Sequence, residues 1–139
     1  MISLTYLSTA TDAFGERELR DLLDASRSRN HAADLTGMLL YVGGHFIQTL
    51  EGPDHVVDET FARIEKDPRH RDVFTALREE IESRTFPDWS MGFESLSADQ
   101  ASLLPGFNDY LETRTISEES GRDLGRAGIA HRVFRDRMR

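Results

Sequence analysis

Two adjacent glycines separate two short apolar segments in the first half of the chain. Gly43 and Gly44 follow residues 38–42 and precede residues 45–50. A two-residue connection of this kind predicts a tight β-hairpin, because glycine readily adopts the positive φ angles that such turns require. We therefore expect this part of the chain to form two antiparallel strands.

Hydropathy patterns predict a strand and a helix before the hairpin. Residues 2–8 alternate, with Ile2, Leu4 and Tyr6 on one face, which indicates a strand. Residues 16–30 have helical periodicity. One stripe of this expected helix consists of Leu19, Leu22, Leu23 and Ser26.

A second helix and two strands are predicted after the hairpin. Residues 54–66 place Val57, Phe61 and Ile64 at positions i, i+4 and i+7 of a helix. Residues 73–81 fit a half-exposed strand, although a helix also matches their pattern. The last strand is expected to carry three alternating large residues, Trp89, Met91 and Phe93.

The resulting order of elements is β-α-β-β-α-β-β, which predicts an α+β fold of the ferredoxin-like βαββαββ type. Two helices are expected on one face of a five-stranded mixed sheet, and the helix crossovers make this sheet partly parallel. These elements occupy residues 1–95. Residues 96–139 are expected to form a C-terminal helical extension for signal output or oligomerisation, with helices at 97–104 and 117–137.

The 139-residue chain carries a net charge of −8, which argues against sequence-independent nucleic-acid binding. From Arg122 onward the net charge is +4, so the rest of the chain carries −12. This basic end suggests an element that docks on the body or on a partner. No apolar run is long enough to span a bilayer and no secretory signal is recognisable, which is compatible with the cytoplasm.

The chain contains no cysteine, which excludes a disulfide framework, a thiolate nucleophile and an iron–sulfur cluster. The five histidines lack the spacing of a metal site. No phosphate-binding glycine loop and no serine-hydrolase motif occur. The sequence therefore predicts neither a metal site nor an enzymatic centre.

Two polar side chains interrupt apolar rows on the inward face of the predicted sheet. Tyr6 follows Leu4, and Gln48 lies between Phe46 and Leu50. A buried amide without partners costs about 1–3 kcal/mol, so an inward Gln48 needs hydrogen bonds. The interpretations are a Tyr6–Gln48 bond in the core, an exposed Gln48, or two side chains that face a polar heteroaromatic ligand.

Other polar residues also have two interpretations. Asn30 either caps the C-terminus of the first helix or presents its amide to a ligand carbonyl. The charged cluster after the second helix is either solvated or contacts a phosphate or ribityl group. This cluster consists of Arg63, Asp67, Arg69 and His70. Trp89 by itself is typical of a core aromatic residue.

Taken together, five segments resemble the BLUF family, whose members sense blue light with a flavin. The resemblance covers about residues 1–95, and its segments occur in the right order with consistent spacing. They are LTYLS (4–8), SRSRN followed by LTGMLLY (26–41), GHFIQTLEG (44–52), RIEKDPRH (63–70) and RTFPDWSMGF (84–93).

The resemblance implies a flavin between the two helices and over the sheet, FAD first, with FMN or riboflavin as alternatives. Leu22 and Ile64 match the positions that sandwich the ring, and Asn30 matches the amide on its pyrimidine side. Gln48 matches the residue beside N5 and O4, and Tyr6 matches the tyrosine bonded to it. The pocket-wall positions are matched by Phe46, Leu39 and Leu40. The ribityl and phosphate positions are matched by Arg63, Asp67, Arg69 and His70.

The resemblance also implies a mechanism. Light absorption by the flavin makes Tyr6 a donor of an electron and a proton, and Gln48 changes its hydrogen bonds by rotation or tautomerisation. Trp89 and Met91 then exchange places near Gln48 and pass the signal onward. These four residues are the expected photoactive set.

About 44 residues follow residue 95, too few for the cyclase or phosphodiesterase domain that many family members carry. We therefore expect a stand-alone, non-enzymatic sensor. Its expected partners are flavin, further copies of itself and an unidentified effector protein, with no membrane and no nucleic acid. Two rival interpretations are a small flavin-dependent reductase and a flavin-free ferredoxin-like interaction module.

Overall fold

The structure is a computed structural model, and it describes residues 1–11, 16–87 and 91–95. The predicted C-terminal helices and Trp89 lie outside these residues. The elements in chain order are β1 (Ile2–Ala10), α1 (Glu16–Ala32), β2 (Thr36–Val42), β3 (His45–Gly52), α2 (Asp54–Glu65), β4 (His70–Glu80) and β5 (Gly92–Ser95). No helix in the described part is both long enough and apolar enough to cross a membrane.

The strands form one sheet in the order β4-β1-β3-β2-β5. Its body consists of four antiparallel strands, and the four-residue β5 pairs in parallel with β2 at the edge. Each helix joins two strands that run in the same direction but have an antiparallel strand between them. The sheet is partly parallel as predicted, but its parallel neighbours are β2 and β5, because β3 separates β1 from β2 and β1 separates β3 from β4.

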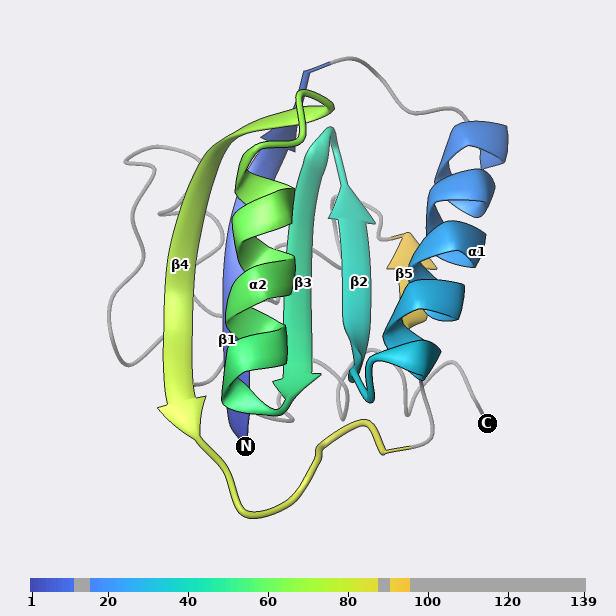
Figure 1. Cartoon of the computed structure of the whole chain (residues 1–139). Coiled ribbons are helices and arrows are strands. Elements are labelled where there is room, and N and C mark those ends of the chain that lie inside the picture. The colour runs from blue at the N-terminus through green and yellow to red at the C-terminus, as the bar shows by residue number, and fades with distance from the viewer. Residues whose placement is uncertain (12–15, 88–90, 96–139) are drawn as a thin grey trace.

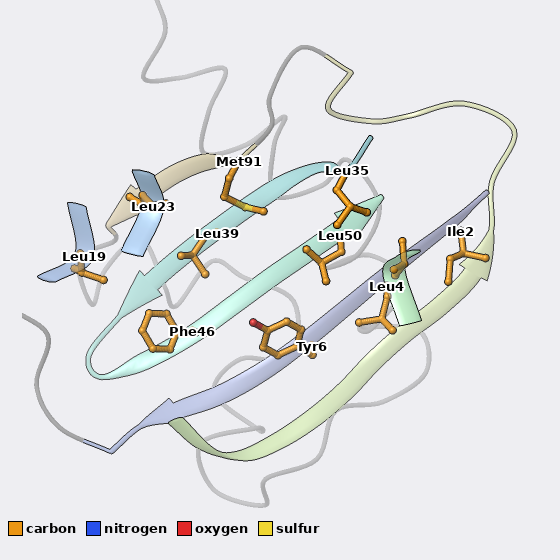
Figure 2. Close-up of a cluster of buried hydrophobic side chains, with 11 residues drawn as sticks. Ile2, Leu4, Tyr6, Leu19, Leu23, Leu35, Leu39, Phe46, Leu50 and Met91 are labelled. Carbon is orange, nitrogen blue, oxygen red and sulfur yellow. The ribbon is translucent and has the colours of Figure 1, made fainter. Parts of the chain in front are cut away.

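Both helices lie on the same face of the sheet, with α2 across β1 and β3 (Figure 1). The predicted α+β class with two helices over a sheet is confirmed. The core between these layers contains Leu19 and Leu23 of α1 and Val57 of α2. The sheet side of this core, much of it drawn in Figure 2, consists of Ile2, Leu4, Tyr6, Leu39, Phe46, Leu50 and two residues just before strands, Leu35 before β2 and Met91 before β5.

Several boundaries differ from the sequence prediction, and one difference changes an interpretation. Helix α1 extends to Ala32, so Asn30 lies within its last turn and is not the residue that ends the helix. The left-handed conformation belongs to Asp34, whose φ is 61°. The interpretation of Asn30 as the C-terminal cap is wrong, because the backbone turns four residues later.

Two other differences concern the strands near the predicted site. Strand β3 continues to Gly52, two residues beyond the predicted strand, so Glu51 belongs to β3. Strand β5 begins at Gly92, so Met91 precedes it, although Met91 and Trp89 were predicted within the last strand. Of the ambiguous segment at residues 73–81, all but the last residue belong to strand β4.

Glycine has two different roles in the β2–β3 hairpin. Gly43 and Gly44 have φ angles of 54° and 83°, which confirms the predicted turn. Gly37 has no unusual backbone angle, but a Cβ atom there would lie 1.9 Å from the carbonyl oxygen of Thr49. Gly37 is therefore required because a side chain has no space where β2 approaches β3. Gly43 is required because the turn has a positive φ angle there.

These roles predict unequal effects of alanine. Gly37→Ala is expected to lower the free energy of unfolding by about 3 kcal/mol, because a methyl group collides with the backbone of the neighbouring strand. Gly43→Ala is expected to lower it by about 1 kcal/mol, because only the backbone angle is strained and no atom lies within 4 Å. Urea unfolding of both variants measures the difference, and equal losses would contradict the assignment.

Candidate functional site

A cavity of about 470 Å³ is lined by residues of α1, α2, the sheet and the turn after α2. All but one of the residues predicted to contact a flavin line it. They are Tyr6, Leu22, Asn30, Leu39, Phe46, Gln48, Arg63, Ile64, Asp67, Arg69 and His70. Segments that are far apart in sequence therefore meet at one site.

Leu40 is the exception, and its prediction as a pocket-wall residue is wrong. Consecutive residues of a strand point to opposite faces of the sheet. Leu39 pairs with Gln48 and lines the cavity, whereas Leu40 pairs with Ile47 and lies on the opposite face with 1% exposure. The two leucines therefore have different roles.

Strand register brings Tyr6 and Gln48 together. They are directly paired on the antiparallel strands β1 and β3, and both side chains point to the face covered by the helices. The Tyr6 hydroxyl donates a hydrogen bond to Gln48 Oε1. The Gln48 side chain is buried, so the interpretation of an exposed glutamine is wrong. Tyr6 and Gln48 form the predicted hydrogen bond in the core, and the same two side chains also line the cavity.

Met91 is the second partner of Gln48. The Gln48 amide donates from Nε2 to Met91 Sδ at 3.4 Å. Met91 is 2% exposed and lies on the same face as Tyr6 and Leu39 (Figure 2). Both ends of the Gln48 amide are therefore occupied, with oxygen toward the phenol and nitrogen toward the thioether.

Burial controls the protonation of Tyr6. Loss of contact with water disfavours the phenolate and raises the pKa of Tyr6 far above its ordinary value, and the negative charge of Asp67 raises it further. The ring lies among other aromatic groups, with centroids 5.3 Å from Phe61 and 6.3 Å from His70. Tyr6 is therefore a neutral hydrogen-bond donor at physiological pH.

The end of the cavity near α2 is polar. Asp67 accepts hydrogen bonds from the Arg69 backbone amide at 2.9 Å and from Arg69 Nε at 3.0 Å, and the bonds to Arg69 lower the pKa of Asp67. His70 is held by Ser8, whose Oγ lies 2.9 Å from Nδ1, and by the carbonyl oxygen of Ile64. Asp67 and His70 are half-buried, whereas Arg63 and Arg69 are exposed. The predicted contact of this cluster with a phosphate or ribityl group stays a prediction.

Sequence reasoning missed some residues of the cavity. Those that line it without having been predicted are Ser26, Arg29, Leu50, Thr60, Lys66 and Pro68. Ser26 could have been found, because it is four residues from both Leu22 and Asn30 and therefore shares their helix face. Arg29 also comes from α1, three residues after Ser26, whereas Leu50, Thr60, Lys66 and Pro68 come from β3, α2 and the turn after α2.

A buried carboxylate near the cavity was also missed. Glu51 is fully buried and accepts hydrogen bonds from the backbone amides of Thr85 at 2.6 Å and Phe86 at 2.9 Å. Arg84 donates to the Glu51 carbonyl oxygen at 3.0 Å and to that of Asp34 at 2.8 Å. These bonds fasten the segment after β4, which leads toward Met91, to the end of β3.

Comparison with known proteins decides the family. The sequence model of the BLUF family, sensors of blue light using FAD, matches residues 1–92. The chain belongs to the BLUF family. It therefore comes from a family of blue-light flavin photoreceptors, as the sequence segments predicted.

Relatives of this BLUF chain differ in length. It is 35% identical to photoactivated adenylate cyclase subunit beta of Euglena longa over 112 residues, which are 80% of this chain but only 13% of that protein. It is similar to the dark-state structure of BlrB, a BLUF protein, with 37% identity and a TM-score of 0.73 over 93% of this chain and 95% of that one. It is also similar to Klebsiella pneumoniae BlrP1 with FMN and cyclic diGMP, with 32% identity and a TM-score of 0.64 over 68% of this chain and 25% of that one.

The residues of the cavity fit the FAD cofactor of the BLUF family. Leu22 and Ile64 provide apolar walls from the two helices, as a flat ring requires. Gln48 provides an amide at the sheet. The groups suited to a phosphate are Arg29, Arg63, Lys66 and Arg69. Apolar walls, a few hydrogen-bonding groups and a cationic end together match the chemistry of a flavin nucleotide.

The raised pKa of Tyr6 predicts a pH dependence of stability. A tyrosine in the unfolded chain ionises near pH 10, whereas the folded protein keeps the Tyr6 proton. The stabilising contribution is complete below pH 10. Above pH 10 it falls by up to about 1.4 kcal/mol per pH unit, because the unfolded state loses a proton that the folded state retains.

Urea unfolding of the wild-type chain and Tyr6→Phe between about pH 8 and pH 11 tests this dependence. The difference in unfolding free energy between the two proteins is expected to be constant up to pH 10 and to shrink above it. The other ionisable groups are the same in both proteins, so their contributions cancel in the difference between the two unfolding free energies. A difference that stays constant through pH 11 would show that Tyr6 ionises normally.

Proposed function

We propose that the chain detects blue light through the hydrogen bond between Tyr6 and Gln48. The observation that carries this proposal is the position of this pair, which lines the cavity and is buried, with both ends of the Gln48 amide occupied. A donor–acceptor pair with defined bonds has a limited number of alternative arrangements. It can therefore act as a two-state element.

The proposed binding mode assigns each wall of the cavity to a part of FAD. Leu22 and Ile64 hold the ring between the helices, and Asn30 binds its pyrimidine side. The ribityl and phosphate groups are held by Arg63, Asp67, Arg69 and His70. When bound, FAD supplies the absorption of blue light and an acceptor for one electron. Support comes from the common location of these side chains around one cavity.

The protein's part in the light reaction is the movement of one electron and one proton. Tyr6 gives up an electron, and its phenolic proton moves along the existing hydrogen bond to Gln48 Oε1. The raised pKa of Tyr6 keeps this proton in place in the dark. Return of the electron and the proton restores neutral Tyr6, while Gln48 can keep a new orientation or tautomer because its amide has both donor and acceptor groups.

The proposed output is a change in association. Met91 contacts Gln48 directly and precedes β5 at the sheet edge, so rearrangement of the amide reaches this edge first. We propose that the sensor then alters its contact with an effector protein or with a second copy of the chain, through residues 96–139 or the sheet.

Absorption spectroscopy tests the light response. The purified chain is expected to be yellow and to show a small reversible red shift after blue light. Tyr6→Phe and Gln48→Ala are expected to keep the flavin and to lose this shift, because each removes one member of the buried pair. The matched control is Thr5→Val, which removes a hydroxyl from the same strand on the opposite face, where Thr5 bonds to Thr49 at 2.8 Å.

The control variant is expected to shift as the wild type does. A normal shift in Tyr6→Phe or Gln48→Ala would remove that residue from its proposed role. Oxidation of reduced nicotinamide in the dark would favour the reductase instead. A protein that stays colourless after flavin is added would favour the flavin-free interaction module.

Light-dependent association is measured by size-exclusion chromatography with light scattering, in the dark and under blue light. The proposed output predicts that the mass distribution of the full chain, alone or with a candidate effector, differs between the two conditions. The difference is expected to disappear in Gln48→Ala, because the rearrangement starts at this amide. Equal light-dependent changes in the wild type and Gln48→Ala would contradict the proposed route.

A further inference from the structure

Met91 is held at two points by two different elements. Its Sδ atom accepts a hydrogen bond from Gln48 Nε2 at 3.4 Å. Its main-chain carbonyl oxygen accepts a hydrogen bond from Arg27 Nε of α1 at 2.9 Å. The segment that contacts the Gln48 amide is therefore fastened to a helix that also lines the cavity with Leu22 and Asn30.

The contact between Gln48 and Met91 depends on the orientation of the amide. A thioether sulfur accepts a hydrogen bond but has no proton to donate. If the amide turned over, Gln48 Oε1 would face Met91 Sδ, and two acceptors would meet without a proton between them. Met91 therefore loses its side-chain hydrogen bond when Gln48 reorients, and its position then depends on its main-chain contacts and on its packing in the core.

Those main-chain contacts are few in the described part of the chain. Strand β5, which follows Met91, has only four residues, and within the described residues it pairs with β2 alone. The Arg27 bond is a charge-assisted contact from outside the sheet, in a class stronger than neutral hydrogen bonds. The Arg27 hydrogen bond therefore contributes substantially to the position of the Met91 main chain.

Arg27 is separable from the core of the fold. Its side chain is 45% exposed, so its removal leaves no cavity among buried residues. Asp24, one turn earlier, has a carboxylate oxygen 3.9 Å from Arg27 Nη1. A substitution at Arg27 is therefore expected to release Met91 without unfolding the chain.

We propose that Arg27 is a positioning residue that holds the main chain of Met91 so that its sulfur stays against the Gln48 amide. This inference rests on the proposed light response of Gln48. Arg27 thereby favours the dark arrangement of the amide and connects its rearrangement to α1. Loss of Arg27 removes a contact that draws Met91 back to Gln48 after illumination.

The recovery of the dark absorption spectrum after a light pulse tests the inference. Arg27→Ala is expected to retain the red shift but to recover roughly fivefold more slowly, the size expected when one hydrogen bond worth about 1 kcal/mol is lost. Arg27→Lys keeps a donor and is expected to recover at an intermediate rate. The matched control is Arg17→Ala, an exposed arginine about 15 Å earlier on the same helix, which is expected to recover as the wild type does.

A double-mutant cycle separates positioning from a general effect on stability. If Arg27 acts through Met91, then Arg27→Ala has no further effect in a Met91→Leu background, because the sulfur contact is already absent. Recovery of Arg27→Ala at the wild-type rate or faster overturns the inference. The same slowing in the wild-type and Met91→Leu backgrounds also overturns it.

A measurement in the dark separates this inference from the proposed function. The chain has four methionines, so carbon-13 labelling of their methyl groups gives few NMR signals, and Met91→Leu identifies that of Met91. Arg27→Ala is expected to shift this signal and to leave that of Met38, which is buried on the opposite face. An unshifted Met91 signal overturns the positioning role. A wild-type chain without a light response refutes the proposed function, whereas the NMR result still decides whether Arg27 holds Met91.

Discussion

The register between β1 and β3 is the constraint on which the site depends. Tyr6 and Gln48 are direct partners in this register, and their side chains meet only because both point to the helix-covered face. A shift of one residue would send one of them to the opposite face. On that face, Thr5 and Thr49 bond in the same register, so polar contacts on both sides of the sheet favour the same pairing.

The burial that forms the site also sets its chemistry. Tyr6 lies in the apolar core, where desolvation raises its pKa and keeps the phenol protonated. Asp67 strengthens this effect, while its hydrogen bonds with Arg69 keep Asp67 itself ionised. Apolar walls and a charged end thus adjoin within one cavity, because the turn after α2 brings polar residues to the edge of a leucine- and isoleucine-lined space.

The segment between β4 and β5 connects the site to the rest of the molecule. Glu51 binds its backbone amides near Phe86, and Arg27 binds its carbonyl group at Met91. The buried Glu51 carboxylate accepts two backbone hydrogen bonds from this segment, whereas the Met91 end receives one charge-assisted bond from a side chain of α1. The segment therefore has more hydrogen bonds at the Glu51 end than at the end that touches Gln48, which is where a rearrangement of the amide would be felt.

The sequence by itself determined the elements and the family. Alternation around Tyr6, the helical spacing of Val57, Phe61 and Ile64 and the Gly43–Gly44 turn are local patterns, and local patterns predict local structure. Sequence order could not show that β5 pairs with β2, that Glu51 is buried or that Arg27 reaches Met91, because these contacts join segments that are distant along the chain. The same reason explains the error at Leu40, since the face that a strand residue takes is fixed by pairing. Tertiary structure alone decided which side chains share the cavity, because only packing sets the distances between elements.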